Sequence, residues 1–425
     1  MLNQQTISTL YGKPLIKPGA IESELDKIRS AAATQDAANE AHTTGSAGPR
    51  AKATLSNLIV LNTGPGKTDV DAAVDSLINE LCISHPSRFF IVDCNLANAQ
   101  DQSGIAAAVS SRCLLADSGT HICSEEIYIS VSENGVPVVS NLLISLLAPD
   151  VDVVLVVFGD PADERCENNT AISKILHAII KIADRVIYDS EGCGSYAKGI
   201  RTLTSAAVGA TASKDSRAFA QLAGKLSDVN WRRTKRWRGL IAEGFDAERL
   251  VASAPVVHRI ALFCNQSVAD MQRGCIPAEA LILAGWILSS LGLTPEKGSV
   301  AHTVQGVALN CTDGKHSAQL EFSSHAQGQS QEVGIATVEI LAETEDWSAK
   351  LGLTRNHHQG TAEVSIGFTD KGQHAAGSCE FAVRNAPFPV ETLDECVRWS
   401  VVSRREDELY LASMEQSLRI AELVS

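Results

Sequence analysis

The sequence predicts an α/β domain followed by an α+β domain, and three features of the chain predict this fold class. Between residues 55 and 226, short apolar runs alternate with helical periodicity, which is typical of a mainly parallel sheet. Within that region, the runs 105–115 and 122–131 are neighbouring strand candidates, so we expect an antiparallel hairpin added to the parallel sheet. Beyond residue 300, strand-like runs follow one another directly, which favours an antiparallel sheet.

The first domain is expected to alternate buried strands with amphipathic helices. Thr68-x-x-Asp71 has the spacing of a capping box, so a helix is expected to begin there. Its apolar positions Val74, Leu77 and Leu81 recur on one helical face. Strands are expected at 58–62, 89–93, 153–158 and 186–188, and further helices at 138–147, 171–182 and 196–223.

The second domain is expected to begin with a strand at 256–263 and a buried helix at 277–291. That helix is apolar on every side, with Pro277 near its start and Gly292 just past its end, the positions that these residues favour. Thr392-x-x-Glu395 opens a terminal helical region. Further strands are expected near 300–310, 316–323, 333–342, 362–368 and 378–384.

Shorter segments flank and join these domains. Residues 1–54 are expected to form a flexible arm, with a short helix at 21–33 and a linker at 34–50 that is rich in Ala, Thr, Gly and Ser. The domains are expected at 55–226 and 251–425, joined by a helix at 227–250 that is rich in Trp and Arg.

Composition excludes several classes of protein. The 425 residues carry a net charge of -14, which argues against a nucleic-acid binder, because phosphate neutralisation needs a basic surface. The longest apolar stretch, 136–158, is interrupted by Pro149 and Asp150, so it predicts a buried helix and strand instead of a membrane span. The first residues lack the apolar core of a signal peptide. We therefore expect a cytoplasmic protein with neither nucleic acid nor membrane as a partner.

Eleven cysteines are scattered along the chain, and no C-x-x-C pair occurs. This pattern predicts neither a zinc site nor a disulfide framework, so reduced and mostly buried thiols are expected. Cys193 is the candidate redox residue, because Gly192 and Gly194 flank it in a loop that can expose a thiol. The alternative is an ordinary loop cysteine.

Sequence signals for catalysis are poor. Residues 61–68, LNTGPGKT, end in Gly-Lys-Thr, but a phosphate-binding P-loop needs glycine where Leu61 stands. Pro65 also removes one backbone N–H donor from such a loop. No G-x-G-x-x-G, G-x-S-x-G or H-E-x-x-H motif occurs. We therefore expect no catalytic residue, metal or cofactor, and a plain strand-to-helix turn at 61–68.

His85 and Arg88 lie just before and within an expected strand. Because Pro86 favours an extended conformation for His85, the two side chains could bind a phosphate or carboxylate at the edge of the sheet. Equally, they could form hydrogen bonds within the loop. One alternative function follows: a small-molecule or nucleotide-binding α/β regulator or enzyme that acts through the 61–68 and 85–88 loops, with Lys67 and Thr68 near the ligand.

The most distinctive segment is DVNWRRTKRWRGLIAEGFD at 228–246, a basic and aromatic block in an acidic protein. Trp and Arg are enriched at the energetic centres of protein interfaces. The alternative is that the Trp rings belong to the core and that the cations form a solvated helix face. As contact residues for a partner we single out Trp231, Arg232, Arg233, Arg236, Trp237 and Arg238.

The order of several short motifs resembles the OpcA family, known as glucose-6-phosphate dehydrogenase assembly proteins or allosteric effectors. The resemblance covers about residues 55–300. It is carried by the Trp-Arg block, by the His-Pro-x-Arg strand at 85–88, and by the segments ICSEEI at 122–127, ADRVIYDS at 183–190 and AGW at 284–286. One departure is the strand VDVVLVVF at 151–158, where the family usually carries paired tryptophans.

This resemblance implies a non-catalytic effector that binds oligomeric glucose-6-phosphate dehydrogenase and favours its active state. Such activation requires a difference in affinity for two states of the enzyme. The resemblance also implies redox regulation, because related effectors in photosynthetic bacteria are thought to be redox-controlled. A chaperone that assists assembly of the dehydrogenase and then leaves is a further alternative.

Overall fold

The computed structural model describes residues 9–10, 13–42, 50–52, 54–63, 68–94, 104–117, 119–160, 170–192, 194–208, 224–246, 256–325, 334–371, 379–403 and 408–425. The chain divides into two compact units. Unit 1 comprises Met1–Cys193, Arg201–Val229 and Leu393–Arg404, and unit 2 comprises Gly194–Ile200, Asn230–Thr392 and Arg405–Ser425. The predicted fold class is confirmed, since a mostly parallel sheet lies in unit 1 and an antiparallel-rich sheet with helices lies in unit 2.

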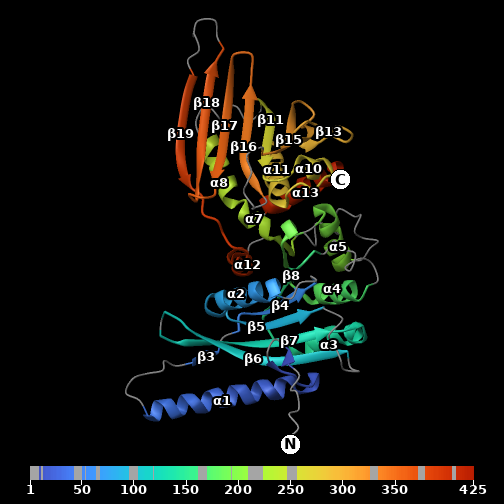
Figure 1. Cartoon of the computed structure of the whole chain (residues 1–425), viewed down its shortest axis with the longest axis vertical. Coiled ribbons are helices and arrows are strands. Elements are labelled where there is room, and N and C mark those ends of the chain that lie inside the picture. Colours follow the sequence, from blue (N-terminus) through green and yellow to red (C-terminus); the bar gives the residue numbers. More distant parts are fainter. Residues whose placement is uncertain are drawn as a thin grey trace, which may run out of the picture. The chain divides into compact units, whose positions relative to one another are not determined.

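The sheet of unit 1 is doubly wound. Its strands are β3 (Arg50–Lys52), β4 (Ser56–Asn62), β5 (Ser87–Asp93), β6 (Ile105–Leu115), β7 (His121–Val131), β8 (Asp152–Phe158), β9 (Arg185–Tyr188) and β10 (Leu226–Asp228). Their order is β10-β9-β8-β4-β5-β7-β3, and Figure 1 shows β4, β5 and β7 in this sheet. β6 pairs with β7 as the predicted antiparallel hairpin, and the other pairs are parallel. The chain winds outward from β4 to β7 and then returns to β8 on the other side of β4, so the winding direction reverses between β4 and β8.

Helices cover both faces of this sheet. They are α1 (Ile21–His42), α2 (Thr68–Ser84), α3 (Val136–Leu146), α4 (Ala171–Ile182) and α12 (Leu393–Val402). α2 and α12 contribute to one hydrophobic core with the strands. α1 and α3 contact the opposite face, where Arg88 of β5 binds Glu22 and the Leu146 carbonyl. A short pair, β1 (Thr9–Leu10) and β2 (Lys13–Pro14), precedes α1.

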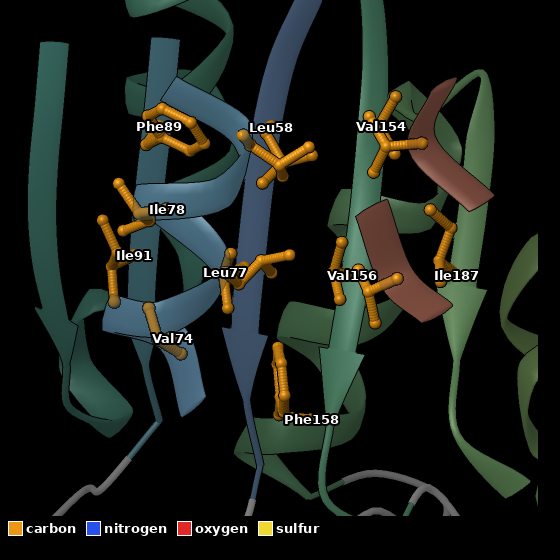
Figure 2. Packing of buried hydrophobic residues seen from close by; sticks show 14 of the residues in the cluster. Leu58, Val74, Leu77, Ile78, Phe89, Ile91, Val154, Val156, Phe158 and Ile187 are labelled. Carbon is orange, nitrogen blue, oxygen red and sulfur yellow. The ribbon is translucent and has the colours of Figure 1, made fainter. Parts of the chain in front are cut away.

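The core of unit 1 forms because its central strands are apolar on both faces, and every residue of β4 and β5 is buried. Figure 2 shows Leu77 and Ile78 of α2 over Leu58 of β4 and Phe89 of β5. Leu58, Leu77, Ile78 and Phe89 are all fully buried. Because one strand face alternates with the other at a period of two, Phe158 at the end of β8 lies on this same face as Val154 and Val156.

Unit 2 has its own sheet. Its strands are β11 (Val257–Cys264), β12 (Thr294–Pro295), β13 (Ala301–His302), β14 (Gly306–Thr312), β15 (Ser317–Ser324), β16 (Ile335–Glu343), β17 (Trp347–Asn356), β18 (Thr361–Asp370) and β19 (Cys379–Pro387). The order is β12-β14-β15-β11-β16-β17-β18-β19, with β13 beside β14. The pairing is antiparallel except between β11 and β15, which are parallel.

Helices of unit 2 pack closely. They are α7 (Val229–Arg233, whose first residue lies in unit 1), α8 (Lys235–Phe245), α10 (Val268–Gln272), α11 (Ala278–Leu291) and α13 (Glu408–Val424); α5 (Tyr196–Val208) spans both units. α11 is the predicted buried helix, with Pro277 before it and Gly292 in the left-handed conformation after it. A Cβ at Gly285 of α11 would lie 2.3 Å from the Ser413 carbonyl oxygen of α13, so only glycine allows this approach.

Three local predictions need correction. The helix expected at 21–33 continues to His42, where a linker was expected, because the Ala-rich stretch has good helix propensity. The single helix expected at 227–250 is broken at Thr234, whose hydroxyl donates to the Trp231 carbonyl, a side-chain bond that bends helices. β17 was not predicted. Of the helix expected at 196–223, the part beyond Val208 lies outside the described residues.

Within the described part of the chain, no helix combines the length and apolarity that a bilayer crossing needs.

Candidate functional site

Both tryptophans of the Trp-Arg block lie in the core of unit 2. Trp237 is fully buried, and its Nε1 donates to the Glu279 carboxylate of α11 at 3.1 Å. Its ring packs edge-on against Phe388, with 4.8 Å between ring centroids. Trp231 is 4% exposed and lies 5.5 Å from the ring of Tyr410. The two Trp rings therefore belong to the core, which was the alternative to a partner contact, and they hold α7 and α8 against the rest of unit 2.

Two arginines of the block are committed to contacts near the Trp231 ring and α7. The Arg238 guanidinium stacks 3.2 Å from the centre of that ring, and its Nη2 donates to the Trp231 carbonyl at 2.9 Å. Arg233 donates to the Asn230 side chain at 2.9 Å. Both side chains are half-buried.

The other two arginines contact residues 387–391, which comprise the last residue of β19 and the segment after it. Arg236 donates to the Pro387 carbonyl at 2.7 Å, and Arg232 forms an ion pair with Glu391. Trp237 meets Phe388 of the same segment. The block thus binds a part of the chain about 150 residues away, in contacts that no local pattern could have predicted.

The outer side of α8 is open to solvent. We define the α8 surface as Lys235, Arg236 and Glu243 of α8 together with Arg384 of β19. The Arg236 side chain is 36% exposed and Arg384 is 53% exposed. Arg384 donates to Glu243 at 2.6 Å, and Arg236 lies 3.9 Å from the same carboxylate. Exposed pairs of this kind contribute little to stability, so these charges are available for long-range attraction.

Glu279 is a residue of this site that our sequence analysis missed. It is 6% exposed and accepts from Trp237 Nε1 and from the backbone N–H of Ile335, each at 3.1 Å. A carboxylate inside a helix that is apolar on every side was the available signal, because buried acidic groups need specific partners.

His85 and Arg88 lie at the start of β5, and both are buried. Arg88 contacts Glu125 at 2.8 Å and Glu22 at 2.9 Å, and it donates to the Leu146 carbonyl. An anion at Arg88 would have to displace two carboxylates that already bind it. The anion site at His85 and Arg88 stays a prediction, and the observed contacts instead hold α1 and α3 on the sheet.

A second charged network covers the other face of the hairpin. Glu126 is 2% exposed, binds Arg112 and accepts from the Tyr128 hydroxyl at 2.6 Å. Arg112 also reaches Asp75 of α2 at 2.8 Å. Burial, and then the charge and hydrogen bond of Glu126, raise the pKa of Tyr128 well above its ordinary value. The hairpin is thereby tied to α2.

The cysteines include one pair that the sequence analysis did not predict. Cys113 and Cys123 lie directly opposite each other on β6 and β7 and form a disulfide. The expectation of reduced thiols is therefore wrong for this pair, because hairpin register brings together residues that no C-x-x-C spacing marks. Five of the free described cysteines are buried and Cys275 is exposed. Cys193 lies outside the described residues.

Residues 64–67 of the suspected nucleotide loop also lie outside the described residues, and Thr68 begins α2. Among the residues that the structure describes, no three His, Cys, Asp or Glu side chains converge as a metal site requires.

Known families match both halves of the chain. A family model described as glucose-6-phosphate dehydrogenase subunit N-terminal domain matches residues 78–205, and one described as the C-terminal domain of that subunit matches residues 224–414. A protein named OxPP cycle protein OpcA from Nostoc punctiforme is 25% identical over 221 residues, which are 52% of this chain and 41% of that protein. Its namesake from Synechocystis is 22% identical over 238 residues, 55% of this chain and 42% of that protein. The matched region thus spans about two fifths of these relatives' length.

Solved structures give weaker likenesses. Glucose-6-phosphate 1-dehydrogenase from Mycobacterium avium has a TM-score of 0.47 and 9% identity, over 86% of this chain and 91% of that chain. An oxidoreductase structure from Thermotoga maritima has a TM-score of 0.38 and 11% identity, over 85% and 96% of the two chains. Scores at this level carry no argument about function. The two family models and the named relatives agree, and the chain belongs to the OpcA family.

Proposed function

We propose that this chain is a non-catalytic effector or assembly subunit that binds oligomeric glucose-6-phosphate dehydrogenase and activates it in the oxidative pentose phosphate pathway. The observation that supports this most strongly is the match of both halves of the chain to models named for a subunit of that enzyme. The lack of any catalytic motif in the sequence supports a regulatory role. A partner of this kind implies a cytoplasmic location.

The Trp-Arg block remains the proposed partner site, with its residues in two roles. Trp231, Trp237 and Arg232 hold α7 and α8 in place, since their side chains are buried or paired within unit 2. Arg233 and Arg238 are also half-buried and contact α7, whereas Arg236, whose side chain is 36% exposed, adjoins the exposed Lys235 on the α8 surface. A preorganised helix loses less entropy on binding, so buried anchors strengthen a site without touching the partner.

Activation requires that the effector bind the active state of the dehydrogenase more tightly than the inactive state. A coupling of about 1–3 kcal/mol, or 5- to 150-fold in affinity, is typical of allosteric proteins. The chain's net charge of -14 makes a cationic α8 surface a local exception, which favours an acidic patch on the dehydrogenase as its counterpart.

We include redox regulation in this proposal. The supporting observation is the Cys113–Cys123 disulfide between β6 and β7, where Cys113 is exposed and Cys123 half-buried. A solvent-accessible disulfide is open to attack by an external thiolate. Cys193 stays a second candidate that lies outside the described residues.

The test is a titration of the same organism's glucose-6-phosphate dehydrogenase with this protein, following KM and kcat, together with size-exclusion chromatography. We expect a saturable fall in KM or rise in kcat with co-elution. Co-elution without an activity change, or a complex that dissociates once the dehydrogenase has assembled, would indicate the chaperone alternative. No effect and no co-elution in either oxidising or reducing buffer would refute the proposal.

Charge reversal separates the α8 surface from the rest of the molecule. Lys235→Glu with Arg236→Glu should weaken binding and make it less dependent on salt, since rim charges act mainly on association rate. The matched control is Arg273→Glu with Lys297→Glu, two exposed cations elsewhere in unit 2. If both variants bind the dehydrogenase with equal affinity, the α8 surface is not part of the interface. Variants of Trp231 or Trp237 cannot decide this point, because loss of a buried ring destabilises the fold as well.

A further inference from the structure

We propose that unit 1 carries a binding site for a ribonucleoside moiety at the carboxyl edge of its sheet, where the winding direction reverses between β4 and β8. In doubly wound sheets, ligands bind outside the carboxyl ends of the strands at such a reversal. The inference goes beyond the effector role and does not depend on it. Three features of the described residues carry it: a row of buried polar side chains, an unpaired hydroxyl and an adjoining apolar cavity.

The polar row consists of Asn62, Asp93 and Ser130 at the ends of β4, β5 and β7. Asn62 is the register partner of Asp93, and Asp93 is the partner of Ser130. All three residues are 2–3% exposed. By strand alternation they lie on the α2 face, immediately beyond the apolar residues of the core. Polar groups are rarely buried side by side at the end of an apolar core without a role, because their desolvation is unfavourable.

Ser130 supplies the observation that points to a ligand. Its residue is 2% exposed, and its hydroxyl has no hydrogen-bond partner within the described part of the chain. Buried hydroxyls are normally paired, so an unpaired one beside the carboxylate-bearing Asp93 needs an explanation. A hydroxyl of a bound molecule would satisfy it.

The cavity adjoins this row on the same face. Its volume is about 200 Å³, and its lining is mostly apolar, including Phe158 and Gly159 of the β8 end, Val229, and Leu393 and Val397 of α12. Phe158 is the register partner of Asn62, so cavity and polar row meet there. Gly159 has a φ of 100°, a conformation that favours glycine, so no side chain projects from the end of β8 at this point.

The chemistry of these groups selects the ligand class. An apolar cavity of this size accepts a flat heteroaromatic ring, and a carboxylate accepts hydrogen bonds from neighbouring hydroxyls. β8 and β5 are two strand spacings apart, roughly 10 Å, which is comparable to the length of a nucleoside. A base in the cavity would therefore place its ribose toward Asn62 and Asp93. Phosphates would lie farther along the edge, toward solvent.

Binding to the isolated full-length chain tests the proposal, with adenosine, AMP and NADP⁺ as probes. We expect at least one probe to raise Tm in a concentration-dependent manner and to give a saturable calorimetric signal. The 2′-deoxy form of that probe should bind about tenfold more weakly, because it lacks the hydroxyl that would donate to the Asp93 carboxylate.

Four variants locate the site. Asp93→Asn and Leu393→Trp, which fills the cavity, should each weaken binding about tenfold or more. Ser130→Ala removes an unpaired hydroxyl, so it should fold normally and still weaken binding several-fold. The matched control is Asp152→Asn at the opposite, amino edge of the sheet, which is exposed and should bind like the native chain.

Two outcomes would overturn the proposal. One is the absence of any thermal or calorimetric signal with all three probes at millimolar concentration. The other is binding that Ser130→Ala and Leu393→Trp leave unchanged, which would place the ligand elsewhere. If Asp93→Asn fails to fold, those two variants decide the matter by themselves.

Discussion

The buried pair of Trp237 and Glu279 gives the sharpest test of how unit 2 is held together. Trp237→Phe keeps most of the ring that packs on Phe388 but removes the indole N–H that donates to Glu279 at 3.1 Å. The Glu279 carboxylate would then keep only the backbone N–H of Ile335, also at 3.1 Å.

The expected cost combines two effects. A buried polar group that loses its partner costs about 1–3 kcal/mol. Replacing the fully buried indole by a smaller ring leaves a partial cavity, which adds roughly 1 kcal/mol. We therefore expect a loss of about 3 kcal/mol in the free energy of unfolding. For a unit of this size that corresponds to a fall in Tm of about 6–12 °C.

Urea unfolding followed by far-ultraviolet circular dichroism measures this loss without depending on the replaced fluorophore. Glu279→Met, which removes the acceptor, alone and together with Trp237→Phe completes a double-mutant cycle, in which we expect a coupling energy of about 1–2 kcal/mol. The matched control is Trp347→Phe, a half-buried ring that stacks on Phe368, where we expect less than about 1 kcal/mol. Additivity within about 0.5 kcal/mol in the cycle would refute the reasoning.

Further predictions concern other buried groups. Burial raises the pKa of the Cys311 thiol from 9.0 to about 12. The buried neutral thiol therefore contributes fully to the free energy of unfolding below pH 9. This contribution is lost as the pH rises from 9 to 12, by at most about 1.4 kcal/mol per pH unit. Urea titrations should show that the free energy of unfolding falls less between pH 8 and pH 10 for Cys311→Ala than for Cys275→Ala, which removes an exposed thiol. An equal fall for the two variants would contradict the assignment. Arg88→Met should cost about 2–3 kcal/mol in urea unfolding, because the buried Glu125 carboxylate loses one of its two cations and keeps only Arg29, and a loss below about 0.5 kcal/mol would show that Arg29 alone satisfies it. Reduction of the Cys113–Cys123 disulfide, which spans 10 residues, should lower the free energy of unfolding by about 3 kcal/mol. A variant with serine at both positions should be insensitive to reductant. If reductant leaves the stability of the native chain unchanged, the bond is absent.

Local periodicity was sufficient where a whole element follows one pattern. The hairpin of β6 and β7 and the buried helix α11 were predicted close to their observed bounds. β17 was missed although Trp347, Ala349, Leu351 and Leu353 alternate with polar or small residues as a strand requires, and its place in the sheet comes from pairing with β16 and β18. The break at Thr234 was missed because the rest of the block has helical periodicity.

The candidate sites show the same division. The sequence marked the Trp-Arg block as unusual, but its contacts are with Glu279 and with the segment 387–391, far along the chain. Likewise, Asn62, Asp93 and Ser130 are unremarkable as single residues and become a row only through parallel pairing.

By itself, the sequence determined the two fold classes, the hairpin and the membership of a family, because these depend on the spacing of apolar residues and on short motifs in order. Only the tertiary structure decided that the block's rings are buried, that Arg88 is bound by carboxylates, and that Cys113 meets Cys123. The physical reason is that a pattern records which side chains must leave water, whereas their partners come from strands and helices that are distant along the chain.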